Sequence, residues 1–195
     1  PPYSKGQSDF GDNNPNIEYP EIDNSIKNTY GARTTVTAKN SLYDSYVRSL
    51  RWASDRIGEA GIIAFITNSS FIRSSTARGI RACFGDEFNE IWCLDLRGNQ
   101  RTQGEISRKE GGKIFGSGSR APVAIIILVK NYDKKTHIIH YKDIGDYLTR
   151  EQKLKIVKDN KSILGVKDWI TIKSDTDYDW LNQKISKFSE YLPMG

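Results

Sequence analysis

Apolar side chains along this chain fall into blocks, and the blocks predict α-helices that alternate with short strands. A polar stretch over residues 4–38 comes first and carries one short helix near residues 22–29. Apolar residues then recur at steps of three and four over residues 42–53, which predicts an amphipathic helix. Asn40 and Ser41 stand directly before it and have side chains that begin helices.

Three largely apolar runs follow, and each has the length of a strand rather than of a helix. They cover residues 62–66, 90–96 and 121–129, with a helix over residues 76–84 between the first two. Such runs are typical of strands that are buried on both faces, and the alternation of helix and strand predicts a parallel α/β sheet. We expect residues 137–141 to pair back on the last run as an antiparallel hairpin.

The end of the chain has a different pattern. Thr149, with Gln152 three residues later, forms a capping box at the start of a predicted helix. Beyond it, apolar anchors such as Trp169 are separated by polar residues, as at the start of a further module. We therefore divide the chain into an α/β part, residues 1–145, and a second part, residues 146–195.

A long irregular segment separates the second and third apolar runs. It has six glycines and almost no apolar periodicity, and segments this long inside a compact domain are functional or disordered. Its cations are Arg97, Arg101, Arg108, Lys109, Lys113 and Arg120, against Glu105 and Glu110. Because this charge lies in a loop rather than on a helix face, we expect it to bind the phosphates of a nucleic acid.

Composition narrows the class of protein. The 195 residues fit one domain, and the net charge of +5 agrees with a polyanionic partner. No run approaches the roughly 20 apolar residues of a membrane helix, and no signal peptide is recognisable, so no membrane partner is expected. Cys83 and Cys93 lack metal-ligand spacing and read as buried free thiols, which fits a cytoplasmic location.

Several familiar sites are disfavoured by spacing. Lys113 follows two glycines but precedes Ile114 and a strand, whereas a phosphate-binding loop needs Ser or Thr and a helix there. His137 and His140 fall on opposite faces of a strand, so joint metal binding is disfavoured. Asp95, at the end of a strand, suits either a ligand or a hydrogen-bonded turn, and we favour the turn.

The chain begins with Pro1, Pro2 and Tyr3. Two prolines fix two φ angles and remove two N–H donors, so this stretch offers carbonyl acceptors beside an aromatic ring. Such a segment suits a loop that holds a planar base by its exocyclic amine. An ordinary chain start is the alternative interpretation.

The order of these features resembles the catalytic half of adenine-N6 DNA methyltransferases. Three blocks resemble more specifically the methyltransferase region of large bacterial restriction-modification polypeptides, which join helicase, nuclease and methylase activities. The blocks are Asn-Ser-Leu-Tyr-Asp-Ser-Tyr at residues 40–46, Leu-Arg-Gly-Asn-Gln-Arg-Thr at 96–102 and Lys-Ile-Phe-Gly-Ser-Gly-Ser-Arg-Ala-Pro at 113–122.

The resemblance implies roles for particular residues. Pro1, Pro2 and Tyr3 are the implied catalytic residues: the Pro1 carbonyl accepts a hydrogen bond from the amine of an extruded adenine, and Tyr3 stacks on the base. An Asn before Pro1 supplies the second acceptor in such enzymes, so that the nitrogen lone pair faces the methyl group of S-adenosylmethionine. Phe115 matches a second aromatic residue that packs against the base.

The resemblance also implies the fold and the partners. It predicts an α/β fold, the C-terminal part of a Rossmann-like methyltransferase sheet with a terminal antiparallel hairpin. Residues 1–145 are then the C-terminal half of the catalytic domain, and residues 146–195 a helical linker and the start of a target-recognition module. The substrate is double-stranded DNA. The S-adenosylmethionine site lies mostly outside this chain, so the chain alone is expected to be inactive.

Two further expectations remain open to test. In the family sheet, residues 62–66 pair with a strand that precedes Pro1, so the chain is expected to expose an apolar sheet edge and to self-associate. RNA and protein-glutamine methyltransferases share the proline loop, but the basic loop favours DNA. The alternative from another class is a non-catalytic DNA-binding or specificity module.

Overall fold

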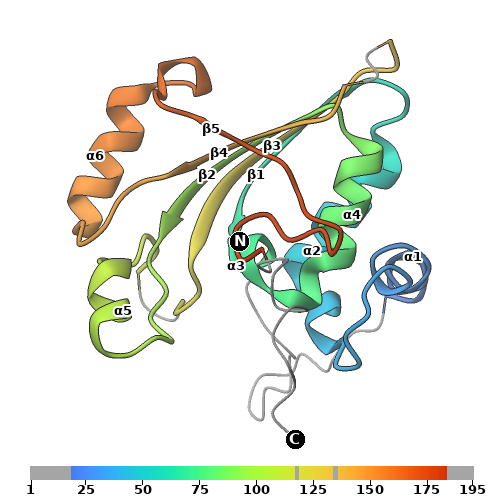
Figure 1. Cartoon of the computed structure of the whole chain (residues 1–195), viewed down its shortest axis with the longest axis horizontal. Helices are drawn as coiled ribbons and strands as arrows, with labels where there is room; N and C mark the ends of the chain where they lie inside the picture. Colours follow the sequence, from blue (N-terminus) through green and yellow to red (C-terminus); the bar gives the residue numbers. More distant parts are fainter. Residues whose placement is uncertain (1–18, 117–118, 134–135, 184–195) are drawn as a thin grey trace, which may run out of the picture.

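A computed structural model describes residues 19–116, 119–133 and 136–183, which form an α/β body around one five-stranded sheet (Figure 1). The order of the strands across the sheet is β1-β3-β2-β4-β5. The strands are β1 (Gly61–Asn68), β2 (Glu90–Arg97), β3 (Val123–Lys130), β4 (Ile138–Asp143) and β5 (Ile170–Ile172). The predicted α/β class is confirmed, and four of the strands were expected from apolar runs. The expectation of a parallel sheet is wrong, because three of the four strand pairings are antiparallel.

The expected hairpin between β3 and β4 is wrong. β3 lies between β1 and β2 and is antiparallel to both, so that Ile127 pairs with Ala64 on one side and Trp92 on the other. β4 pairs in parallel with β2 and antiparallel with β5. β3 is apolar along both faces, as expected for a strand inside the sheet, whereas His140 and Lys142 give β4 one polar face. β1 and β2 point the same way but are not adjacent.

Helices cover the two faces of the sheet unequally (Figure 1). On one face, helical segments pack with strand residues such as Ile63, Ile91 and Ile126 into the main core. These segments are α1 (Pro20–Ile26) with its π-helical extension η1 (Lys27–Gly31), α2 (Ser45–Arg56), α3 (Ser70–Arg73) and α4 (Arg78–Glu87). On the other face, α6 (Arg150–Asn160) covers a smaller cluster that includes Leu94 and Val166.

Local chemistry explains where the helices begin. Asn40 and Ser41 start only a 3-10 turn, η2 (Asn40–Tyr43), and α2 begins after Asp44, whose buried carboxylate accepts a hydrogen bond from the Tyr46 amide. Two further 3-10 turns, η3 (Ser75–Ala77) and η4 (Ile163–Gly165), precede α4 and follow α6. The capping box predicted at Thr149 is confirmed, with both of its hydrogen bonds present.

β1 is an edge strand of this sheet. Within the described ranges β1 pairs with β3 alone, and the side chains of Ile62 and Ile66 are 69% and 50% exposed. The expectation that this strand is buried on both faces is therefore wrong for the face that carries these two residues. The exposed apolar edge that the sequence predicts is present in the part of the chain that the structure describes.

The segment after β5 returns to the main core. Trp180 is 3% exposed and packs edge-on against Phe71, and the carboxylate of Asp179 accepts hydrogen bonds from the guanidinium groups of Arg78 and Arg81. Cys83 is buried, as expected, and so is Cys93; both are free thiols. Among the described helices, none has the length and apolar character needed to cross a membrane.

Candidate nucleic-acid interface

The strands β1, β2 and β4 end at the same edge of the sheet, and a polar network is buried there. Asp95, near the end of β2, is fully buried and accepts a hydrogen bond of 2.9 Å from the amide of Arg97. Its other oxygen accepts hydrogen bonds from the guanidinium of Arg73 and, at 3.2 Å, from the hydroxyl of Tyr141 on β4. The interpretation of Asp95 as a turn residue is confirmed, and the turn fixes where the basic loop leaves β2.

Arg97 is held by acidic side chains at this turn. It has a positive φ of 56°, and its guanidinium lies 2.7 Å from Asp143 and 2.5 Å from Asp146. Burial opposes ionisation of Asp143, but hydrogen bonds from Arg97 and from the Gly145 amide outweigh it, and the pKa of Asp143 lies below its ordinary value. Arg97, which we expected to contact phosphate, is thus engaged within the protein.

The loop after Arg97 is anchored on the segment that precedes α6. The Gly98 amide donates to the carbonyl of Glu110, the Gly112 amide to that of Leu148, and the Tyr147 amide to that of Lys109, at 2.9–3.2 Å. At Gly111, with φ of 65°, an added Cβ would lie 2.2 Å from the carbonyl oxygen of Leu148. Glycine is therefore required there by both the backbone conformation and the close approach.

Lys153 on α6 completes the anchor. Its side chain is fully buried, and Nζ donates to the carbonyl oxygens of Glu110 at 2.7 Å and Gly112 at 2.8 Å. Burial lowers the pKa of Lys153. Sequence reasoning missed this residue, since a lysine in a polar helix carries no pattern that marks it as buried.

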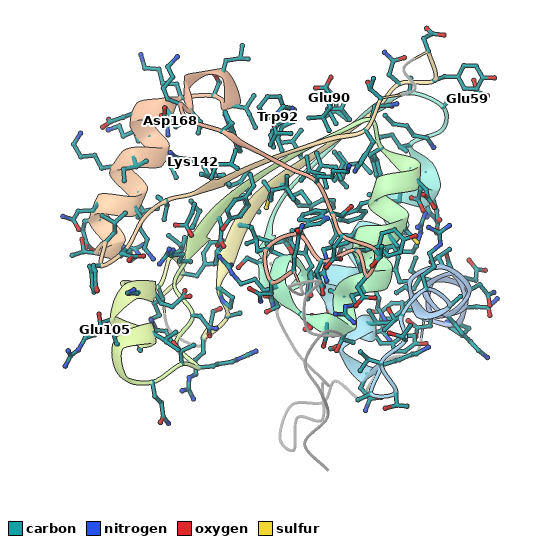
Figure 2. All side chains as sticks on the ribbon, in the orientation of Figure 1. Glu59, Glu90, Trp92, Glu105, Lys142 and Asp168 are labelled. Atoms are coloured by element: carbon teal, nitrogen blue, oxygen red, sulfur yellow. The ribbon has the colours of Figure 1, made fainter. Side chains whose placement is uncertain are left out.

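The loop also contains a helix that the sequence did not predict. α5 (Gly104–Glu110) lies beyond the end of β2, and its side chains project away from the sheet, as the labelled Glu105 illustrates (Figures 1 and 2). The absence of apolar periodicity, which we interpreted as absence of a helix, instead reflects a helix with no buried side chain. Arg108 and Lys109 lie on α5 with side chains 78% and 49% exposed.

The other predicted cations lie around α5. Arg101 and Arg120 are exposed, and Lys113 is half-buried. The guanidinium of Arg120 donates to the carbonyl of Gln100 at 2.9 Å, which ties the two ends of the loop together. Apart from Arg97, these side chains therefore form a cationic surface on a folded loop.

Of the residues that the resemblance implies contact the base, the described part of the chain includes Phe115. Phe115 packs against the cluster that contains Ile114 and Leu94, on the α6 side of the sheet. Pro1, Pro2 and Tyr3 lie outside the described residues.

A polar pocket of about 250 Å³ connects the end of β1 to the basic loop. Asn68 at the end of β1, Asp44 at the start of α2 and Arg101 from the loop contribute to its wall. Hydroxyl side chains supply much of the remaining lining, from Ser41, Ser70, Ser74 and Thr76. The pocket lies outside the carboxyl end of a strand, the usual position for ligands in α/β sheets.

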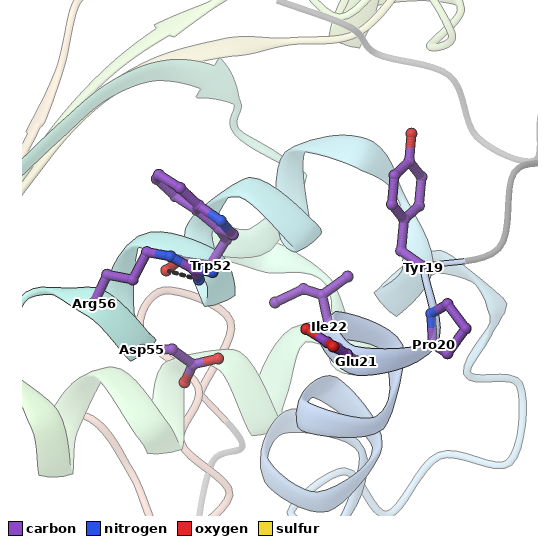
Figure 3. A pocket seen from close by; sticks show the side chains of 7 residues that line it. All are labelled: Tyr19, Pro20, Glu21, Ile22, Trp52, Asp55 and Arg56. Carbon is purple, nitrogen blue, oxygen red and sulfur yellow. Dashed lines mark hydrogen bonds between the residues drawn. The ribbon is translucent and has the colours of Figure 1, made fainter.

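A separate hollow of about 580 Å³ lies between α1 and α2 (Figure 3). Trp52, which is 53% exposed, and Arg56, whose guanidinium lies 4.4 Å from the Trp52 ring centre, form one side of it. None of the residues that line it comes from the strand ends or from residues 97–120. It is therefore distinct from the cationic surface.

The two histidines have separate environments. Nδ1 of His137 lies 2.9 Å from the carbonyl oxygen of Phe88, before β4 begins. His140 stacks on Trp92, with ring centres 3.6 Å apart and planes inclined by 15°. Burial lowers the pKa of His140. Each ring therefore has a local packing or hydrogen-bonding partner.

Comparison with known proteins gives a consistent result. No protein-family model and no curated protein matches the chain. A solved structure of a nuclease-deletion mutant of the Type ISP restriction-modification enzyme LlaGI, in complex with a DNA substrate mimic, is 53% identical over 98% of this chain, with a TM-score of 0.92. The ATP-dependent Type ISP restriction-modification enzyme LlaBIII, bound to DNA, is 40% identical over 97%, with a TM-score of 0.90.

A third solved structure, DrdV in a complex with DNA, is 39% identical over 99% of this chain, with a TM-score of 0.88. This chain spans only 15%, 13% and 19% of the LlaGI, LlaBIII and DrdV chains. The chain is thus similar, along nearly its whole length, to a segment of restriction-modification enzymes. The resemblance inferred from its sequence blocks is confirmed at that level.

Proposed function

We propose that this chain is a segment of a restriction-modification polypeptide and forms the base-holding half of its DNA adenine-N6 methyltransferase. The observation that carries the proposal is the cationic loop, anchored at the carboxyl edge of β2 in a chain 53% identical to a segment of LlaGI. The proposed substrate is double-stranded DNA, the methyl donor S-adenosylmethionine, and the location cytoplasmic. The division into residues 1–145 and 146–195 remains part of this proposal.

The proposed roles follow from the contacts of each group. Arg97 positions the loop, because two carboxylates already neutralise its guanidinium. The remaining cations of the loop bind phosphates on the DNA backbone and give most of the affinity, since each neutralised phosphate releases counterions. These cations are Arg101, Arg108, Lys109, Lys113 and Arg120.

The proline loop and the aromatic residues act on the base. We propose that the Pro1 carbonyl accepts a hydrogen bond from the adenine amine, that Pro2 keeps this stretch rigid, and that Tyr3 and Phe115 pack against the extruded base. Extrusion costs a few kcal/mol, and stacking returns about 1–3 kcal/mol per base. Stacking on two rings is therefore of the size needed to offset the extrusion.

We propose that the site for S-adenosylmethionine lies mostly outside this chain. The polar pocket at the end of β1 has a volume of about 250 Å³ and includes the buried carboxylate of Asp44. Ligands of drug or cofactor size occupy pockets of roughly 300–1,000 Å³. This pocket is therefore smaller than a cofactor site, in agreement with a site located mostly in other parts of the polypeptide.

Methyl transfer by the full-length polypeptide tests the proposal. Labelled methyl groups from S-adenosylmethionine should appear on N6 of adenine in duplex DNA. Changing both Arg108 and Lys109 to Gln should flatten the dependence of log affinity on log salt by about 1.8, or 0.9 for each lost phosphate contact. Lys155 and Lys158 on α6 are also exposed and serve as the matched control, with an unchanged slope.

The outcomes separate the proposal from its alternative. DNA binding without any methyl transfer would support a non-catalytic specificity module. Equal salt slopes in the two double variants would show that Arg108 and Lys109 do not contact the DNA phosphates. Transfer to RNA or to protein in place of DNA would reject the proposed substrate.

A further inference from the structure

α5 is held rigidly although none of its side chains is buried. A helix of seven residues is not stable in water by itself. α5 is fixed from outside: the Glu110 carbonyl accepts from Gly98 and Lys153, the Glu110 carboxylate from the Asn99 amide, and the Lys109 carbonyl from Tyr147. At the other end, the hydroxyl of Tyr147 donates to Glu105 at 2.5 Å. The fold thus presents α5 to solvent in a defined position.

The apolar side chain on α5 is turned to solvent as well. Ile106 is 63% exposed, and no buried core cluster includes it within the described ranges. Lys109 lies three residues further along the helix and therefore on the same side as Ile106, with Nζ 3.9 Å from Asp146. Arg108, two residues from Ile106, projects from the other side of the helix and is 78% exposed. An isoleucine among cations is the composition of elements that contact phosphates and press an apolar group against base pairs.

We infer that Ile106 is an apolar wedge that inserts against the base stack of duplex DNA while Lys109 binds a flanking phosphate. The inference rests on the proposed function for the identity of the partner. It adds a step at this interface: the wedge partly unstacks one base step beside the target, so the adjacent adenine loses stacking and is extruded more readily. The anchored backbone of α5 holds the wedge in place during this distortion.

The test uses the full-length polypeptide and a duplex with its own methylated sequence, which is found by mapping N6-methyladenine in DNA from cells that express it. One 2-aminopurine is placed at each position of the site in turn, since its fluorescence rises when neighbouring bases unstack. We expect a step outside the target adenine to brighten on binding. Ile106→Ala should lower this rise about fivefold at saturating protein, and Ile106→Leu should retain it.

Two matched variants control for other causes. Ile170→Ala removes an isoleucine with nearly the same exposure, 60%, from β5, and should leave both fluorescence and affinity unchanged. Lys109→Ala should weaken binding but preserve the rise once DNA is saturated. Alanine is a strong helix former, so Ile106→Ala should keep α5 folded, and an unchanged melting temperature checks this.

The results distinguish this inference from the proposed function. If the wild-type polypeptide binds and methylates DNA but Ile106→Ala gives the same fluorescence rise, the wedge is wrong and the proposed function stands. If wild type shows no DNA binding, the proposed function itself fails. A loss of the rise with Ile170→Ala would also overturn the wedge, because the effect would not be specific to α5.

Discussion

Nζ of Lys153 lies 2.7 Å from the carbonyl oxygen of Glu110, and this contact joins α6 to the last residue of α5. The same ammonium group donates to the carbonyl of Gly112, so it binds both sides of the turn that ends the helix. Since Lys153 is fully buried, the charge is shielded from water and its interactions with these carbonyls are strengthened. The position of the cationic surface therefore depends on a residue that does not face DNA.

We expect Lys153→Met to loosen the loop while leaving every exposed cation in place. The Gly112 carbonyl loses the Lys153 donor, which costs about 1–3 kcal/mol, while the Glu110 carbonyl keeps the hydrogen bond from the Gly98 amide. The loss is partly offset because Met need not be desolvated as a charge. DNA affinity should fall, and amide hydrogen exchange in residues 104–112 should accelerate. Lys155→Met, two residues further along α6 and exposed, is the control and should change neither. Unchanged exchange in Lys153→Met would contradict the anchoring role.

The pH dependence of stability should report the Arg97–Asp143 contact. The pKa of Asp143 in the folded chain lies below that in the unfolded chain. Its stabilising contribution is therefore complete above about pH 4 and is lost as the pH falls through the lowered folded value. Asp143→Asn should melt at a lower temperature than wild type at neutral pH, and the difference should shrink below about pH 4. A difference that is the same at all pH values would count against this contact.

The segment that contains Trp180 should depend on Asp179. Its carboxylate faces two guanidinium groups, and that of Arg81 is fully buried. Asp179→Ala leaves a buried cation without a counterion, which costs about 3–5 kcal/mol. Asp159→Ala removes an exposed carboxylate 2.5 Å from Lys155 on α6, and should cost less than about 1 kcal/mol. Chemical denaturation of both variants compares them, and equal losses would reject the role of Asp179.

Self-association through β1 stays a prediction of the sequence that the edge position makes testable. The 195-residue chain should form larger species as its concentration rises, measured by light scattering after size exclusion. Ile66→Lys places a charge on the edge strand and should suppress association. Leu164→Lys, in η4 outside the sheet and 82% exposed, should not. A chain that is monomeric at every concentration would contradict self-association through β1.

The sequence predicted well which segments form strands, but poorly which strands are neighbours in the sheet. Apolar runs located β1, β2, β3 and β4 because burial of a strand leaves a local signature. The insertion of β3 between β1 and β2 is set by long-range pairing, which no local pattern encodes. The same limit applies to the site. The cations of the loop were visible in the sequence as charge, but their contacts in the fold were not.

Other features of the site left no signal in the residue pattern. α5 is hidden because all of its side chains are exposed, which removes the periodicity that marks most helices. The engagement of Arg97 by Asp143 joins residues 46 positions apart. Both features follow from how residues 97–112 dock on residues 143–153, and docking of this kind is a tertiary property.

The base-holding role of the chain's first residues is the central claim, and Tyr3 tests it most directly. In the full-length polypeptide, Tyr3→Ala should reduce methyl transfer to adenine by about 10- to 100-fold, since stacking on a base contributes about 1–3 kcal/mol. Tyr3→Phe keeps the ring and should retain most of the activity, while DNA affinity at a site with the adenine removed should be equal in all three proteins. Methylation by Tyr3→Ala at the wild-type rate would contradict the account.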